Sequence, residues 1–268
     1  MMQRIITGVL SAALLIFIIY VRGVVFDVVI ALAAFLSCYE MIKAFNKANV
    51  KPVMVPVYGM ALLMLPAFLL LGALGIFFVS AFAAFAIMFQ IALRKDPRWM
   101  DAAASLNVLL GVPLPLMMLY PILRIDPPEL GALLTFLVFV IALLGDTFAY
   151  FVGVSIGKHK MAPAISPKKT WEGAIGGLLG STLGAALLCI GGRTIVTMPP
   201  LWHFILLGLV GGVAGQLGDL SASLIKRFCG AKDFGTIFPG HGGMMDRIDS
   251  IIFVCYVLFG YCLATGLV

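Results

Sequence analysis

The sequence predicts an all-α, polytopic integral membrane protein, and its composition is the main reason. Hydrophobic residues make up 62% of the 268 positions and charged residues only 11%, whereas soluble domains carry about 25% charged residues. The mean hydropathy is +1.13. A soluble globule of this size cannot bury so much apolar surface, so the composition excludes a cytosolic enzyme, a secreted domain and a disordered chain. Long segments that alternate apolar and polar residues are absent, so we do not expect a transmembrane β-barrel.

Nine apolar segments predict about nine transmembrane helices, because each crossing needs about 20 apolar residues. The Arg22-Gly23 pair separates the first two segments, which together are too long for one crossing, and Gly72 and Gly75 indicate a tight turn between the third and fourth. No small-residue cleavage site follows the first segment, so we expect a retained helix and not a signal peptide. The predicted segments cover residues 5–21, 24–44, 55–72, 75–93, 103–123, 130–151, 172–191, 201–225 and 250–267.

The lysines and arginines predict that the N-terminus is cytoplasmic, because basic residues concentrate in cytoplasmic connections. With the N-terminus inside, the outer connections hold only Arg22, Arg124 and Arg193. The other 15 basic residues fall in inner connections: Arg4, Lys43, Lys47, Lys51, Arg94, Lys95, Arg98, Lys158, Lys160, Lys168, Lys169, Lys226, Arg227, Lys232 and Arg247.

We divide the chain into N-terminal transmembrane helices, residues 1–128, and a C-terminal catalytic region, residues 129–268. The two longest cytoplasmic loops, residues 152–171 and 226–249, both belong to the second part and are rich in Gly and Lys. The N-terminal helices are expected to guide lipid substrates into the enzyme or to form a homodimer interface. The five cysteines form no CxxC pair, so we expect buried free thiols.

Two aspartates interrupt apolar segments near their predicted cytoplasmic ends. Asp146 follows a long apolar run, and an ionisable group there is by default a candidate for function. Asp219 can share a helix face with Ser223 and Lys226, so that a carboxylate, a hydroxyl and an ammonium lie on one stripe. The alternative for Asp146 is an acid that is simply hydrated at the membrane interface. The alternative for Asp219 is a capped helix end whose side chains extend to the headgroups.

The loop at residues 232–249 carries the most specific pattern. Its glycines allow the backbone to approach a ligand closely, and Asp246 and Asp249 are spaced to share one helix face. Carboxylates at this density suit Mg²⁺, which commonly binds one or two of them together with substrate phosphates. His241 has no second His or Cys nearby, so zinc is not expected. The alternative is an ordinary exposed turn whose acids cap the next helix.

The other long loop ends in two adjacent basic residues, Lys168 and Lys169, directly before a predicted helix. Ser166 or Thr170 is expected to cap that helix, with Glu172 near its positive end. A helix N-terminus flanked by lysines suits an anionic group. The alternative is a generic basic loop that is attracted to anionic lipid headgroups.

Taken together, these motifs resemble a known family. The segment 223–249, with SLIKR followed by KDFGTIFPGHGGMMDRID, is similar to the signature of the phosphatidate cytidylyltransferase (CDP-diacylglycerol synthase) family, and residues 145–173 resemble the segment upstream of that signature. The resemblance implies an enzyme that joins CTP to phosphatidic acid and releases pyrophosphate and CDP-diacylglycerol. It also implies a bacterial cytoplasmic (inner) membrane location with the active site facing the cytoplasm.

We hypothesise that the lipid phosphate attacks the α-phosphorus of CTP with the help of Mg²⁺, and that four acids suffice for a second metal ion. The net charge of +6 suits anionic lipid and CTP, so no nucleic-acid partner is expected. The expected metal ligands are Asp219, Asp246, Asp249 and Asp146. The expected catalytic residues are Asp219, Asp246, Lys226, Arg247 and His241. The expected substrate-binding residues are Lys168, Lys169, Ser223, Arg227, Lys232, Asp233, Gly242 and Gly243.

Two other functions stay open at this point. One is a different CTP-dependent membrane lipid enzyme, such as a polyprenol or phytol kinase. The other is an ion-coupled transporter, which would favour acids near the bilayer midplane and an inverted repeat. The sequence shows neither of these transporter features.

Overall fold

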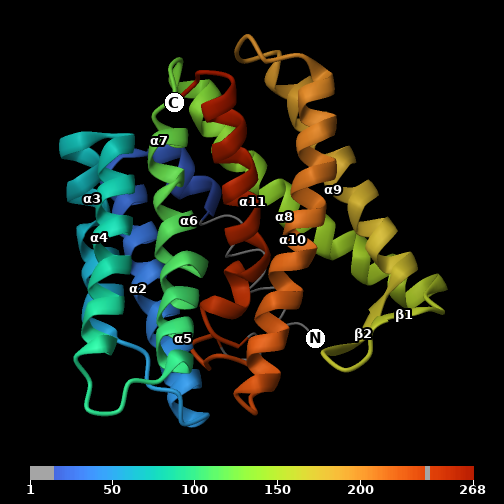
Figure 1. The fold of residues 1–268 in the computed structure, drawn as a ribbon. Helices are drawn as coiled ribbons and strands as arrows, with labels where there is room; N and C mark the ends of the chain where they lie inside the picture. The colour runs from blue at the N-terminus through green and yellow to red at the C-terminus, as the bar shows by residue number, and fades with distance from the viewer. Residues whose placement is uncertain (1–14, 239–241) are drawn as a thin grey trace. The chain divides into compact units, whose positions relative to one another are not determined.

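The computed structural model describes residues 15–238 and 242–268, and within them the chain is almost entirely helical (Figure 1). Within the described residues, eight helical spans are long and apolar enough to cross a membrane, and one of them, Trp99–Leu123, contains short breaks. The prediction of an all-α polytopic membrane protein is therefore confirmed. Of the first predicted segment, residues 5–21, the part from 15 to 21 is helical and the rest lies outside the described residues.

The described elements follow one another in chain order, with two short strands between the eighth and ninth helices. They are α2 (Gly23–Lys47), α3 (Met54–Leu71), α4 (Ala73–Ala92), α5 (Trp99–Gly111), α6 (Pro113–Met117), α7 (Leu119–Leu123), α8 (Pro128–Ile156), β1 (Lys160–Ala162), β2 (Ser166–Thr170), α9 (Trp171–Gly192), α10 (Leu201–Phe228) and α11 (Met245–Ala264).

The predicted breaks between the first helices are present. Arg22 adopts a positive φ of 57° before α2, and Gly72 adopts a φ of 59° between α3 and α4. At Gly75 a Cβ atom would overlap the carbonyl of Ala67, so the α3–α4 turn requires glycine there. Both predicted breaks are therefore confirmed.

The predicted segment 103–123 is not one continuous helix. It is divided into α5, α6 and α7, with Val112 in a non-helical conformation between the first two. Pro113 directly follows this break and Pro115 comes two residues later, and a proline cannot donate the backbone hydrogen bond that would continue a helix.

The chain forms two compact units. The first unit comprises the described residues up to Pro121 together with Phe228–Ile248, and the second unit comprises Ile122–Arg227 together with Asp249–Val268. The sequence-based division at residue 128 was drawn differently, because it left residues 228–248 with the C-terminal half. The structure groups this glycine-rich segment with the N-terminal helices.

In the second unit, α8 and α9 pack closely along much of their length (Figure 1). Gly176, Gly180 and Gly184 form the contact face of α9; a Cβ atom at Gly180 would lie 2.6 Å from the Cβ of Phe148 on α8. Small residues let membrane helices approach closely, because the backbones then meet without side chains between them.

The loop predicted over residues 152–171 contains regular structure that the sequence analysis did not predict. Helix α8 continues to Ile156, and β1 then pairs antiparallel with β2, with Lys160 opposite Thr170. Strands of three and five residues are too short to show an alternating pattern. The hairpin therefore became visible only in the structure.

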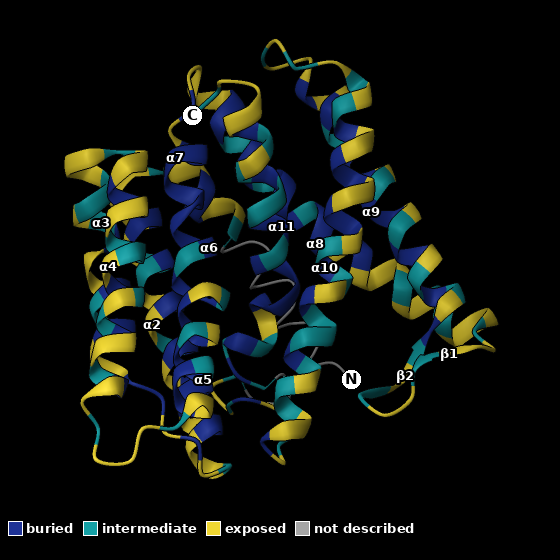
Figure 2. Cartoon of the chain, in the orientation of Figure 1, coloured by how far each residue is buried: buried dark blue, intermediate teal, exposed yellow. Residues whose placement is uncertain are grey.

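Large apolar side chains are exposed on the outer faces of α3 and α4 (Figure 2). Leu70, Phe82 and Phe85 have 81%, 74% and 75% of their surface exposed. Exposure on this scale would be costly in water and is expected where helices face lipid. The five cysteines are all buried and free, as predicted.

Candidate active site

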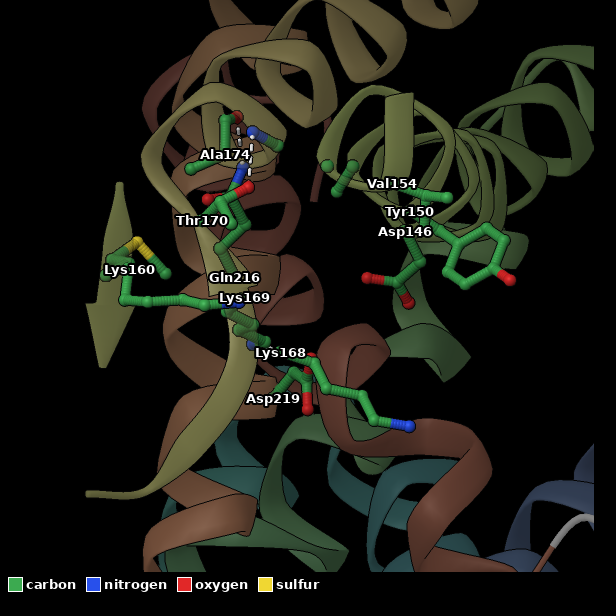
Figure 3. A pocket seen from close by; sticks show the side chains of 14 residues that line it. Asp146, Tyr150, Val154, Lys160, Lys168, Lys169, Thr170, Ala174, Gln216 and Asp219 are labelled. Carbon is green, nitrogen blue, oxygen red and sulfur yellow. Dashed lines mark hydrogen bonds and ion pairs between the residues drawn. The ribbon is translucent and has the colours of Figure 1, made fainter. Parts of the chain in front are cut away.

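A cavity of about 470 Å³ lies in the second unit, between the end of α8, the β-hairpin, the start of α9 and the middle of α10 (Figure 3). Four predicted site residues line it: Asp146, Lys168, Lys169 and Asp219. Two of them come from the hairpin and two from membrane-spanning helices. The structure therefore brings the two upstream motifs into one site.

Lys169 and Asp219 form an ion pair across this cavity. The Lys169 Nζ lies 2.6 Å from an Asp219 carboxylate oxygen, and 22% and 29% of the two side chains are exposed. The pair is partly shielded from water but still accessible, so both charges are available to a ligand. Figure 3 shows Asp146 on the α8 side of the cavity and Lys169 with Asp219 on the other side.

Asp249, near the start of α11, belongs to the same group of charges. Its side chain is buried, with its Oδ2 3.8 Å from the Lys226 Nζ, and it interacts electrostatically with the carboxylates of Asp219 and Asp146. The next residue, Ser250, donates its hydroxyl to Asp146 Oδ2 over 3.1 Å. Three predicted metal ligands are thereby gathered in the second unit.

Thr170 fixes the position of the two hairpin lysines. Its buried hydroxyl accepts a hydrogen bond from the Gly173 N–H over 3.1 Å and caps α9. Of the two predicted caps, Thr170 and Ser166, the structure thus selects Thr170. At the same open end of the hairpin, Glu172 accepts the His159 N–H and lies 2.6 Å from its Nδ1, which connects the start of β1 to the first turn of α9.

Arg227 and Ser223 have different surroundings at the end of α10. The Arg227 Nε donates to the Ile165 carbonyl over 3.1 Å and thereby connects the end of α10 to the hairpin turn. Ser223 is half-buried on the same helix as Asp219. Their predicted roles in substrate binding stay predictions.

Asp246 belongs to the first unit, where it organises the signature loop. Its Oδ2 accepts the backbone N–H groups of Phe234 and Gly243, each over 2.9 Å. The N–H of Phe238 is bonded to the Gly242 carbonyl over 2.9 Å, which closes the loop further. This carboxylate therefore has a structural task in addition to the metal ligation predicted for it.

The other predicted residues of this loop are mostly exposed. Lys232, Asp233 and Arg247 face outward, whereas Gly243 is buried. His241 lies outside the described residues, so its predicted catalytic role stays a prediction.

Several cavity residues were not predicted. Gln216 lines the cavity and donates its Nε2 to the Ala174 carbonyl over 2.9 Å. Its position three residues before Asp219 places it on the same helix face, and this spacing was a usable signal. Lys160 and Tyr150 also line the cavity, but Lys160 reaches it only because β1 pairs with β2.

The segment Gly153–Gly157 matches the GxSxG pattern of serine hydrolases, but its structural context differs. Ser155 lies in the last turn of α8. The hydrolase motif requires a sharp turn between a strand and a helix that exposes the serine. Ser155 is therefore not a candidate nucleophile.

The carboxylates of the site suit a hard metal ion by their chemistry. Among the described residues, no three His, Cys, Asp or Glu side chains form a group that could hold a metal ion by themselves. Mg²⁺ does not need such a group, because it commonly binds through one or two carboxylates together with water and substrate phosphates. Asp219 and Asp249, both beside lysines, match that mode of binding.

Comparison with known proteins gives matches along nearly the whole chain. A family model described as the Cytidylyltransferase family matches residues 2–265. The chain is 32% identical to the phosphatidate cytidylyltransferase of Bacillus subtilis (strain 168), with 97% of this chain and 96% of the relative covered. It is 31% identical to the protein of that name from Brucella abortus biovar 1, over 96% and 91% of the two chains. It is 30% identical to that from Staphylococcus saprophyticus, over 96% and 97%.

Proposed function

We propose that this chain, which belongs to the cytidylyltransferase family, is a phosphatidate cytidylyltransferase that converts CTP and phosphatidic acid into CDP-diacylglycerol and pyrophosphate. The observation that carries the proposal is the cavity that gathers Lys168, Lys169, Asp146 and Asp219 where apolar helices meet a polar hairpin. Such a site can hold a charged headgroup while the acyl chains stay beside the helices.

The proposed reaction needs no nucleophilic side chain. An oxygen of the lipid phosphate, already an anion, forms a bond to the α-phosphorus of CTP. The bond from that phosphorus to the bridging oxygen of the β-phosphate breaks, and pyrophosphate leaves with the electron pair. Atoms and charge balance without an oxidant or a proton donor, so the protein mainly has to position two anions and reduce their repulsion.

The lysines of the cavity are suited to that task. Lys168 and Lys169 precede the N-terminus of α9, where the helix dipole adds to their positive charge. We assign them to the phosphatidate headgroup or to the leaving pyrophosphate. Because Lys169 already pairs with Asp219, a phosphate that binds there competes with this carboxylate for the ammonium group.

The acids are assigned to Mg²⁺ and, with four carboxylates, to a second metal ion. In the second unit, Asp219, Asp249 and Asp146 would hold a metal ion, and the metal ligation predicted for Asp246 stays a prediction. When bound, Mg²⁺ neutralises charge on the CTP phosphates. Lys226, beside Asp249, is placed to add a fixed positive charge to the same group.

We place the active site on the cytoplasmic side of a bacterial inner membrane. The support is the distribution of basic residues, which puts both long loops on the cytoplasmic side. CTP is available on that side.

The test is incubation of the purified protein with CTP, Mg²⁺ and phosphatidic acid, with pyrophosphate and the lipid product both measured. Equal amounts of CDP-diacylglycerol and pyrophosphate are expected. A phosphorylated lipid together with CDP would instead indicate a lipid kinase. Ion flux in proteoliposomes without chemical conversion would indicate a transporter.

A further inference from the structure

The N-terminal half contains a buried acid that the proposed mechanism does not use. Glu40 lies in the C-terminal half of α2, three residues before Lys43, and only 2% of its surface is exposed. Burial of a carboxylate destabilises the folded protein unless hydrogen bonds compensate for the lost hydration. The contacts of Glu40 should therefore explain why an acid is buried here.

The contact that Glu40 makes lies 205 residues further along the chain, within the same compact unit. Its Oε2 accepts the backbone N–H of Met245 over 2.9 Å. Met245 is the first residue of α11. The first N–H groups of a helix have no partner within the helix and carry its positive end, so a carboxylate from α2 stabilises this start.

Two glycines of the signature loop also pack against the Glu40 carboxylate. A Cβ atom at Gly235 or at Gly243 would overlap it. Gly243 is the residue whose N–H is bonded to Asp246. Glu40 and Asp246 therefore hold the same short stretch of backbone. The close approach explains why glycine is needed at positions 235 and 243.

We infer that Glu40 is a positioning residue for the described part of the signature loop, residues 232–238 and 242–246. It keeps the loop backbone and the first turn of α11 in place, and under the proposed function the basic residues of these two segments, Lys232 and Arg247, bind the CTP phosphates. The inference rests on the proposed function, and it gives α2 an indirect part in nucleotide binding, through the loop. The predicted roles of the N-terminal helices were lipid guidance and dimer formation.

The kinetic test compares Glu40→Gln and Glu40→Ala with Ser37→Ala. Ser37 is equally buried in α2, one turn away, and its hydroxyl has no hydrogen-bond partner among the described residues. We expect Glu40→Gln to raise the KM for CTP at least about tenfold. The neutral glutamine amide accepts the Met245 N–H more weakly than the charged carboxylate does. The KM for phosphatidic acid and the thermal unfolding midpoint should stay near those of Ser37→Ala. Two results would overturn the inference. One is that Glu40→Gln weakens the use of CTP and of phosphatidic acid equally and lowers the thermal unfolding midpoint at the same time. The other is that the kinetics of Glu40→Gln are unchanged.

A second measurement does not depend on activity. Hydrogen exchange of the amides of residues 232–246 in full-length protein should be faster in Glu40→Gln than in wild type and Ser37→Ala. If wild type makes no CDP-diacylglycerol, the proposed function fails, and exchange still decides whether Glu40 holds the loop. Unchanged exchange would overturn the inference even in an active enzyme.

The packing against glycine gives a third test. Gly235→Ala should reduce CTP turnover because the new methyl group displaces the carboxylate. In a Glu40→Ala background the same substitution should reduce CTP turnover less, so the effects of the two substitutions should not be additive. Full additivity would show that the glycine does not act through Glu40.

Discussion

The ammonium of Lys169 lies 2.6 Å from a carboxylate oxygen of Asp219, and this pair joins the β-hairpin to the middle of α10. The two residues are 50 positions apart in the chain and come from two separate motifs. Their contact makes the hairpin part of the candidate site and not merely a basic connection. It also means that a change at either residue leaves the other charge without this partner.

Asp219→Asn should abolish CDP-diacylglycerol formation while leaving the protein folded. The substitution keeps size and shape but removes the charge that pairs with Lys169 and is assigned to Mg²⁺. Loss of electrostatic stabilisation at a reacting phosphate predicts a decrease of at least about 100-fold in kcat. Product formation in detergent measures the effect, and the thermal unfolding midpoint reports folding. Activity within twofold of wild type would remove Asp219 from the metal site.

Lys168→Ala should act on substrate binding more than on turnover. Lys168 is exposed and lines the cavity, so its loss removes one charge-assisted contact to an anion. Such a contact corresponds to about a tenfold rise in KM for one substrate, with kcat changed only slightly. Titration of CTP and of phosphatidic acid separately shows which substrate it binds. Unchanged KM values for both would assign Lys168 to the lipid surface.

Parts of the fold and of the candidate site were predictable because local rules determine them. Arg22-Gly23 and Gly72 break helices through backbone conformation, and Thr170 caps α9 through a bond to a residue three positions away. Each of these features depends only on residues that are close together in the sequence. Asp146 and Asp219 were also identifiable, because an acid in an apolar segment is conspicuous.

The remaining features depend on tertiary packing. The pairing of Lys169 with Asp219 requires β2 and α10 to lie next to each other, and spacing along the chain does not encode this. Glu40 is an acid in an apolar segment like Asp146, but nothing near it in the sequence indicates that its partner is Met245. The hairpin consists of strands too short to be recognised by alternation.

Thr170→Val should destabilise the protein and disturb both hairpin lysines. Valine has the same shape but cannot accept the Gly173 N–H, and loss of a helix cap costs about 1 kcal/mol. We expect a lower unfolding midpoint together with a higher KM for the substrate that binds at the lysines. Thr170→Ser keeps the hydroxyl and serves as the matched control. A normal midpoint in the valine variant would show that the cap contributes nothing.

Asp101→Asn should reduce stability without affecting catalysis. The Asp101 carboxylate, in the first unit, accepts the Lys51 N–H over 2.8 Å and pairs with Arg94 and Arg98 over 2.8 and 2.6 Å. Weakening hydrogen bonds to a charged, buried acceptor predicts a loss of about 1–3 kcal/mol in the free energy of unfolding.

The control for this variant is Asp96→Asn, which changes an exposed acid in the connection between α4 and α5. Thermal unfolding in detergent should separate the two variants, while their kcat and KM values should match wild type. A specific loss of kcat in Asp101→Asn would mean that this acid belongs to the reaction.

Mg²⁺ should stabilise the folded protein against heat, and this effect should depend on the acids of the second unit. A ligand that binds only the folded state raises stability by an amount that grows with its concentration. We therefore expect EDTA to abolish product formation, and Mg²⁺ with CTP to raise the unfolding midpoint of wild type. In Asp219→Asn and Asp249→Asn the increase should be absent, whereas Asp96→Asn should behave as wild type. An equal increase in all variants would place the metal elsewhere, because Asp219 and Asp249 would then not be ligands.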